Sequence, residues 1–313
     1  GFTTPITVGI AFEKVFQAVG RMKVTMTGMM IGCIANIILD PLIIFGIGPF
    51  PRLGIEGAAL ATGIGQVTPV VIYWIIYKIR PISVKIHPEY LKEGKNLVGR
   101  LYAIGVPAIL NLALPSLLIS ALNGILAVYS QSYVVVLGIY YKLQTFIYLT
   151  ANGIVQGMRP IIGFNYGARK PDRLMKTMRL AVTYAVSIMI IGMILFWTFT
   201  PQLLAIFNAS AQMLSIGIPA LRIISLSFLL AGFDIIIISV MQALGHGVIS
   251  LIISILRQLA VLLPVAFIFS KIWGLNAVWI AFPLAECVAL VVTILFWRKV
   301  YRNEIQPLYN AER

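Results

Sequence analysis

Long apolar runs recur along the whole chain and are separated by mostly short polar connections. A helix of about 20 mostly apolar residues is long enough to cross the hydrocarbon core of a bilayer. The fold class that follows is an all-α polytopic membrane protein. The pattern predicts nine membrane helices, near residues 1–18, 24–47, 55–78, 101–128, 133–158, 174–198, 212–242, 247–270 and 274–297.

One connection is longer than the others and carries charged residues and prolines. It extends from Lys78 to Arg100 and reads KIRPISVKIHPEYLKEGKNLVGR. Proline and charge between two apolar segments are typical of a loop. We therefore predict a linker between two halves of the molecule at residues 81–99.

Composition excludes a soluble globular domain. Apolar residues make up 60% of the chain, charged residues 11%, and the mean hydropathy is +0.96. Soluble proteins carry about 25% charged residues. The net charge of +14 does not indicate nucleic-acid binding, because the cations lie between the apolar runs and have no RNA-binding or helix-turn-helix context.

The distribution of Lys and Arg predicts the orientation in the membrane. One set of alternate connections, which includes Arg159, holds 18 of the 24 basic residues, whereas the other set holds only Arg52 and Lys271. Basic residues concentrate in cytoplasmic loops. The chain is therefore expected to enter the membrane from outside and to end in the cytoplasm.

Two pairs of short segments repeat at similar spacing. FQAVG at 16–20 returns as MQALG at 241–245, and GIEGAALAT at 54–62 returns as GLNAVWIAF at 274–282. Order, spacing and predicted orientation agree, so we expect a parallel internal repeat. Extending the repeat backwards predicts roughly three further helices before Gly1, hence twelve helices as six plus six.

The cysteines and histidines show no disulfide or metal-ligand pattern. Cys33 and Cys287 lie within apolar runs, and His87 and His246 are isolated. A nucleophile–base pair is also absent from the sequence pattern. We predict no enzymatic activity and no cofactor.

Residues 31–62 contain a carboxylate at bilayer depth. Asp40 lies in an apolar run, and Asn36 shares its helix face four residues earlier. Pro41 removes a helical hydrogen bond, which favours a kink and frees the carbonyl of Ile37. With Thr62 on the next helix, these groups could form a proton network or coordinate Na⁺ through oxygen atoms. The alternative is an aspartate that only packs helices together at a proline kink.

Several motifs, taken together, cover most of the chain and resemble the multidrug and toxic compound extrusion (MATE) family. The most specific are the LDP of NIILDPLIIFG (36–46) and the GFNYGA of NGIVQGMRPIIGFNYGARKPDR (152–173). The others are QAVGRMKVTM (17–26), GIEGAALAT (54–62) and MQALGHG (241–247).

This resemblance implies a two-lobed exporter of twelve helices that exchanges cationic or amphipathic compounds for H⁺ or Na⁺. The coupling ion would bind at Asn36, Asp40 and Thr62, the places that match the family's N-lobe cation site, and Pro41 would be the conformational element. The implied domains are the second half of the N-lobe at 1–80, the linker at 81–99, the C-lobe at 100–300 and a cytoplasmic tail at 301–313.

The second half contains further ionisable residues in apolar runs. Asp234 matches an acid of sodium-coupled members, but the seventh family helix carries no acid here, only Asn111 and Asn123. Asp234 could instead pair with Lys142 or contact a cationic substrate. Lys142 and Arg257 are second-site candidates that could each partner an acid. The remaining acids in apolar runs are Glu286, expected to pack or form hydrogen bonds, and Glu13, expected to have a local role beside Lys14.

An alternative function within the same superfamily is a flippase for lipid-linked oligosaccharides. A flippase cavity would need several cations at membrane depth to hold a pyrophosphate, and the LDP segment favours the exporter. The partners expected are small amphipathic molecules and the lipid bilayer, without nucleic acid. We predict a monomer in a prokaryotic inner membrane.

Overall fold

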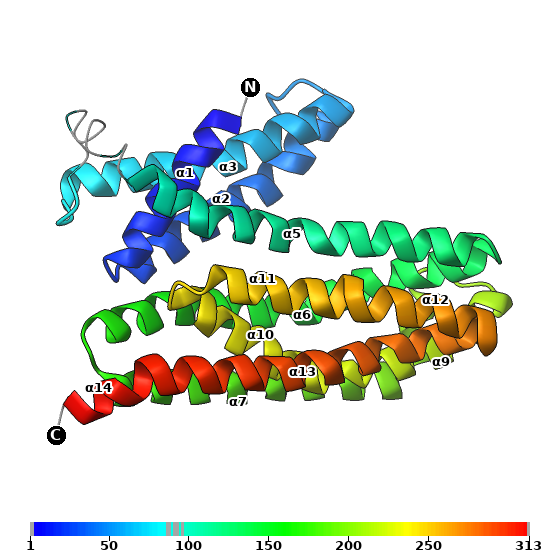
Figure 1. Cartoon of the computed structure of the whole chain (residues 1–313). Helices are drawn as coiled ribbons and strands as arrows, with labels where there is room; N and C mark the ends of the chain where they lie inside the picture. The colour runs from blue at the N-terminus through cyan, green and yellow to red at the C-terminus, as the bar shows by residue number, and fades with distance from the viewer. Residues whose placement is uncertain (1–2, 86–88, 90–93, 95–96, 312–313) are drawn as a thin grey trace. The chain divides into compact units, whose positions relative to one another are not determined.

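The computed structural model describes residues 3–85, 89, 94 and 97–311, and the regular elements in this part of the chain are all helical (Figure 1). The chain divides into two compact units, Gly1–Gly94 and Lys95–Arg313. The division falls inside the predicted linker 81–99. Residues 86–88, 90–93, 95 and 96 of that linker, including His87, lie outside the described residues.

Seven helices of the described chain are long and apolar enough to cross a membrane, and a bent helix pair brings the number to eight if the pair forms one span. The difference from the predicted nine lies at the first segment. Helix α1 (Thr3–Ala18) has 16 residues, which is shorter than the roughly 20 residues that a membrane-spanning helix needs. The predicted all-α, multi-span fold class is confirmed.

The first unit contains α1, α2 (Met22–Phe45) and α3 (Gly54–Ile79). Helices α2 and α3 lie side by side (Figure 1) and approach closely at glycines. A Cβ atom built on Gly65 would lie 2.8 Å from the Cβ of Asn36 and 3.1 Å from the carbonyl oxygen of Gly32. The small residues of 57–66 therefore serve close helix packing, as small residues do at interfaces between membrane helices.

A small aromatic core holds the other end of these helices together. Phe16 of α1 and Tyr73 of α3 are almost completely buried, with ring centroids 5.9 Å apart. The Tyr73 hydroxyl donates a hydrogen bond to the carbonyl oxygen of Thr25 at 2.9 Å. This bond satisfies the polar end of a buried tyrosine.

The second unit is a larger helix bundle around a continuous apolar core that includes Leu122, Tyr140, Phe228 and Phe282. Its elements are α5 (Val98–Ala127), α6 (Gln131–Gly167), α7 (Pro171–Thr198), α8 (Thr200–Ala205), α9 (Ala211–Ser225), α10 (Ser227–Ala243), α11 (Gly247–Ile255), the π-helical η2 (Leu256–Leu262), α12 (Leu263–Ile272), the 3₁₀ helix η3 (Leu275–Ile280), α13 (Ala281–Val300), the π-helical η4 (Tyr301–Ile305) and α14 (Gln306–Ala311).

The helix predicted at 212–242 is bent by 44° between α9 and α10. Two serines flank the break. The Ser225 hydroxyl donates to the carbonyl oxygen of Arg222 at 2.9 Å, and the Ser227 hydroxyl donates to that of Ile224 at 2.6 Å. Serine hydroxyls that bond to carbonyls of the preceding turn compete with the helical hydrogen bonds and bend the helix.

Helix α6 extends beyond its predicted end at residue 158. It continues through Pro160 to Gly167, and α7 begins at Pro171, three residues before its predicted start. Proline at the first position of a helix is well tolerated because the missing N–H has no helical partner there. The consequence is that Arg159, assigned to a connection from the sequence, lies inside a helix.

Candidate functional site

Two polar side chains on one face of α2 form the centre of the candidate site. Asn36 and Asp40 are four residues apart on this helix. The Nδ2 atom of Asn36 and the Oδ1 atom of Asp40 are buried, and neither forms a hydrogen bond. Because a buried carboxylate oxygen without a partner costs free energy, Asp40 is suited to a proton or cation that supplies the missing interaction. The Asn36 N–H group only donates and would need an acceptor instead.

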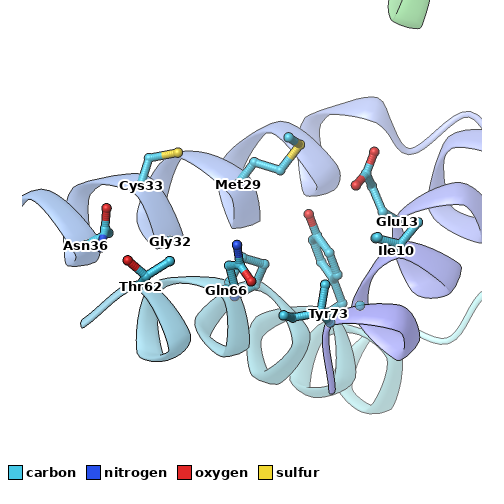
Figure 2. A pocket seen from close by; sticks show the side chains of 13 residues that line it. Ile10, Glu13, Met29, Gly32, Cys33, Asn36, Thr62, Gln66 and Tyr73 are labelled. Atoms are coloured by element: carbon cyan, nitrogen blue, oxygen red, sulfur yellow. The ribbon is translucent and has the colours of Figure 1, made fainter. Parts of the chain in front are cut away.

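Thr62 of α3 lies opposite Asn36 (Figure 2). The two residues line the same pocket, which has a volume of about 350 Å³. The Thr62 hydroxyl donates to the carbonyl oxygen of Ala58 at 2.9 Å, so its oxygen lone pairs are available as acceptors. Asp40 is not among the lining residues but lies one helical turn further along α2.

Pro41 follows Asp40 inside α2, and the helix continues through it to Phe45. Proline has no backbone N–H, so the carbonyl oxygen of Ile37 lacks its usual helical donor. That oxygen lies in the turn between Asn36 and Asp40. The oxygen donors near this turn are therefore a carboxylate, an amide, a hydroxyl and a carbonyl, which suit a hard cation.

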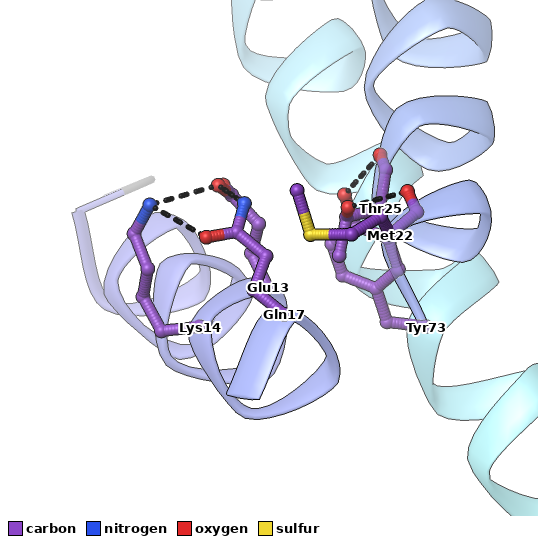
Figure 3. Close-up of polar contacts among 6 residues, drawn as sticks. All are labelled: Glu13, Lys14, Gln17, Met22, Thr25 and Tyr73. Carbon is purple, nitrogen blue, oxygen red and sulfur yellow. Dashed lines mark hydrogen bonds and ion pairs between the residues drawn. The ribbon is translucent and has the colours of Figure 1, made fainter. Parts of the chain in front are cut away.

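Glu13 of α1 also lines the pocket, although sequence reasoning gave it only a local role (Figure 2). Its Oε1 atom accepts a hydrogen bond from Gln17 Nε2 at 2.8 Å and forms an ion pair with Lys14 Nζ at 3.1 Å (Figure 3). The sequence does contain an indication that Glu13 is functional, because an acidic residue within an apolar run often marks a functional site. Its position at the pocket depends on how α1 packs against α3, which no local pattern encodes.

Asp234 of α10 is completely buried, and its carboxylate interacts with the hydroxyl of Thr293 on the neighbouring helix α13. The predicted alternative that Asp234 pairs with Lys142 is wrong. The Lys142 ammonium lies instead over the ring of Phe207, 5.8 Å from its centroid.

Arg257 and Glu286 form a largely buried ion pair. Arg257 NH1 lies 3.1 Å from Glu286 Oε1, and the two side chains are 19% and 12% exposed. Glu286 was expected to pack or form hydrogen bonds, and it accepts hydrogen bonds from Arg257, which was expected to be able to partner an acid. Arg257 lies in the π-helical turn η2, and such turns are frequent at functional sites.

No group of three His, Cys, Asp or Glu side chains could hold a metal ion in the part of the chain that the structure covers. Cys33 and Cys287 are free thiols, and His246 contacts Glu304 at 2.5 Å. The Na⁺ ligands predicted at Asn36, Asp40 and Thr62 include a single carboxylate. Their other ligands are an amide and a hydroxyl, so a search for clusters of acids, histidines and cysteines does not test this site.

Comparison with curated proteins identifies similar bacterial transport proteins. The chain is 28% identical over 283 residues to the multidrug export protein MepA of Staphylococcus aureus (strain MSSA476), an alignment that covers 90% of this chain. The chain spans 61% of the length of that relative.

Solved structures show the same fold. A MATE transporter of Vibrio cholerae, VcmN, has a TM-score of 0.84 at 24% identity, covering 94% of this chain and 66% of that protein. A MOP superfamily transporter of Pyrococcus furiosus has a TM-score of 0.79 at 26% identity, covering 91% of this chain and 63% of that protein. The MatE family model matches residues 107–268, just over half of the sequence. The chain therefore belongs to the MatE family of membrane transporters.

Proposed function

We propose that this chain forms part of a secondary active exporter that moves cationic or amphipathic compounds across the cell membrane in exchange for H⁺ or Na⁺. The family and the multidrug export relative support this class of transport. The pocket of about 350 Å³ in the first unit has a volume typical of small-molecule sites. Its lining is mostly apolar and includes one acid, Glu13, which suits an amphipathic cation.

The observation that carries the proposal is the buried carboxylate oxygen of Asp40 that has no hydrogen bond. An ionisable residue within a membrane helix is expensive and marks an ion or proton pathway. The Oδ1 atom of Asp40 is buried and has no hydrogen bond. A structural aspartate would be expected to satisfy its buried oxygen within the protein, so this oxygen favours an ion site over simple helix packing.

The proposed mechanism begins when Asp40 binds H⁺ or Na⁺ from the outside. A bound cation neutralises the carboxylate and draws in oxygen donors from Asn36 and Thr62. Because Pro41 leaves α2 with one hydrogen bond fewer at this point, the helix can bend there at lower cost. A change in the shape of α2 changes the pocket that Asn36 and Thr62 line, which lowers the affinity for the exported compound.

Release of the ion on the inside resets the cycle. The exported compound and the ion bind best to different states, so each biases the equilibrium towards the state that it prefers. Exchange then requires only that the two states open to opposite sides of the membrane. Asp234 is a second candidate ion carrier, because it is completely buried and forms no ion pair with the described residues, and a buried carboxylate is stabilised by a proton or a cation.

The test is transport of a fluorescent cation by the natural protein in proteoliposomes, with pH and sodium gradients imposed separately. Asp40→Asn is expected to abolish transport driven by either gradient while the protein remains folded in the membrane. Glu56→Gln, at an exposed acid in the first turn of α3, is the matched control and should transport normally. Normal transport by Asp40→Asn would refute the assignment of Asp40.

The flippase alternative receives less support. It needs free cations at membrane depth to hold a pyrophosphate group. Arg257, one of the candidates, is paired with Glu286, and Lys142 lies over an aromatic ring. These two side chains are therefore not arranged as a joint pyrophosphate site.

A further inference from the structure

A second pocket lies wholly within the second unit, and its lining includes none of Asn36, Asp40 and Thr62. Its volume is about 170 Å³, which is smaller than the roughly 300–1,000 Å³ of pockets that enclose drug-sized molecules. It lies where α5, α6, α10 and α11 meet, and α11 lies alongside α5 (Figure 1). The lining residues are Ile104, Ala108, Arg159, Gln242, Ala243, Gly247 and Ser250.

Arg159 places a positive charge in this pocket without a negative partner. Its guanidinium donates to Gln242 Oε1 and, at 3.4 Å, to the hydroxyl of Ser239, both of which are neutral groups. The Nε atom is buried and has no hydrogen-bond partner. The ion pairs among the described residues do not include Arg159.

A charge in this situation is unusual because arginine does not lose its proton in proteins. Arg159 is half-buried, and a charge that is partly withdrawn from water is normally paired with an opposite charge. Lysine or histidine could become neutral, but Arg159 cannot. An anion that enters the pocket would supply the missing charge and a partner for Nε.

Neighbouring polar side chains form hydrogen bonds with one another, so the acceptor oxygens that line the pocket are already occupied. Gln242 Nε2 donates to Ser250 Oγ at 3.0 Å, and Asn111 Nδ2 donates to the same oxygen at 3.2 Å. Ser250 in turn donates to the carbonyl oxygen of Gly247 at 2.7 Å. Because the Gln242 amide oxygen already accepts from Arg159, the network orients Arg159 while leaving its Nε–H group free.

The N-terminus of α11 contributes to the same pocket. The helix begins at Gly247, a lining residue, and no side chain caps its first turn. The first N–H groups of a helix have no helical acceptor and carry a partial positive charge, which favours anions. The N-terminus of α11 and the guanidinium of Arg159 are two independent features that both favour a negatively charged ligand in this pocket.

We propose that this pocket binds a phosphate ester group, either on a free molecule or in a phospholipid headgroup. The guanidinium of arginine matches the geometry of phosphate oxygens, and the volume admits such a group but not a drug-sized molecule. Ile104, Ala108 and Ala243 offer apolar contacts to the carbon atoms of the ester. This site is separate from the exporter function and does not depend on it.

The experiment measures binding to the natural protein purified in detergent. Calorimetric titration with inorganic phosphate and with glycerol 3-phosphate tests the free form. Native mass spectrometry after addition of phosphatidylglycerol tests the lipid form, and the arm that shows binding identifies the source. We expect Arg159→Gln to weaken binding by at least about tenfold, as loss of a charged hydrogen-bond donor does, and Arg159→Lys to weaken it less.

Two further variants distinguish a loss of binding from a loss of folding. Gln242→Glu places a carboxylate beside Arg159 and should abolish binding while preserving the fold, because it supplies the missing charge internally. Arg173→Gln changes an exposed arginine of α7 and should leave binding unchanged. Absence of binding by the natural protein in both arms, equal binding by Arg159→Gln, or tighter binding of acetate than of phosphate would overturn the proposal.

Discussion

Arg257 donates from one guanidinium nitrogen to both carboxylate oxygens of Glu286, at 3.1 and 3.4 Å, and thereby links η2 to α13. Each side chain provides the charge that makes burial of the other tolerable. A single substitution leaves one buried charge alone, whereas replacement of both removes the need for a partner.

We therefore predict that Glu286→Gln lowers the free energy of unfolding by about 3 kcal/mol, the typical cost of breaking a buried pair. The double variant Arg257→Met with Glu286→Leu should recover most of this loss. Thermal unfolding in detergent, compared between single and double variants, measures the difference. A double variant as unstable as the single one would show that the pair does not act through mutual charge compensation.

Thr62 offers a matched comparison on a single helix. Thr62→Val removes the hydroxyl oxygen that faces Asn36, and we expect the affinity for the coupling ion to fall by about tenfold, the effect of one lost polar contact. Thr62→Ser should restore it. Thr68→Val is the control, because the Thr68 hydroxyl also donates within α3, to Ile64 at 2.8 Å, but Thr68 does not line the pocket.

The measurement for these variants is the concentration of H⁺ or Na⁺ that gives half-maximal transport. An equal effect of Thr62→Val and Thr68→Val would mean that the hydroxyl acts only on helix stability.

Gly65 tests the close contact between α2 and α3. A methyl group at this position would lie 2.8 Å from the Cβ of Asn36, which is too close without movement of one helix. We predict that Gly65→Ala destabilises the protein by about 1–3 kcal/mol through overpacking and displaces Asn36. Gly94→Ala, at a glycine with open space around it, is the control. Equal melting temperatures for both variants would contradict the packing argument.

Glu13 tests the role of the pocket in recognising cations. Glu13→Gln keeps the size of the side chain and removes the negative charge at the pocket, so binding of a fluorescent cation should weaken several-fold. Binding of an uncharged analogue should change little. Fluorescence titration of both compounds separates the two effects, and an equal loss for both would indicate that Glu13 shapes the pocket rather than attracting charge.

The sequence by itself determined the membrane helices and the shared face of Asn36 and Asp40. Both depend on spacing along one helix, because apolar length decides whether a segment can cross a bilayer and a separation of four residues places side chains on one face. The motifs around Asp40 and in 152–173 were sufficient to indicate the family. The orientation, the coupling ion and the monomeric state remain predictions from the sequence.

Only the tertiary structure decided which charged residues meet. It placed Glu13 at the pocket, paired Arg257 with Glu286, buried Asp234 beside Thr293 and moved Arg159 from a predicted connection into α6. These outcomes depend on contacts between side chains far apart in the sequence. Hydrophobic periodicity records which face of a helix is apolar but not which helix packs against it, so the partner of a buried charge becomes known only when the helices are assembled.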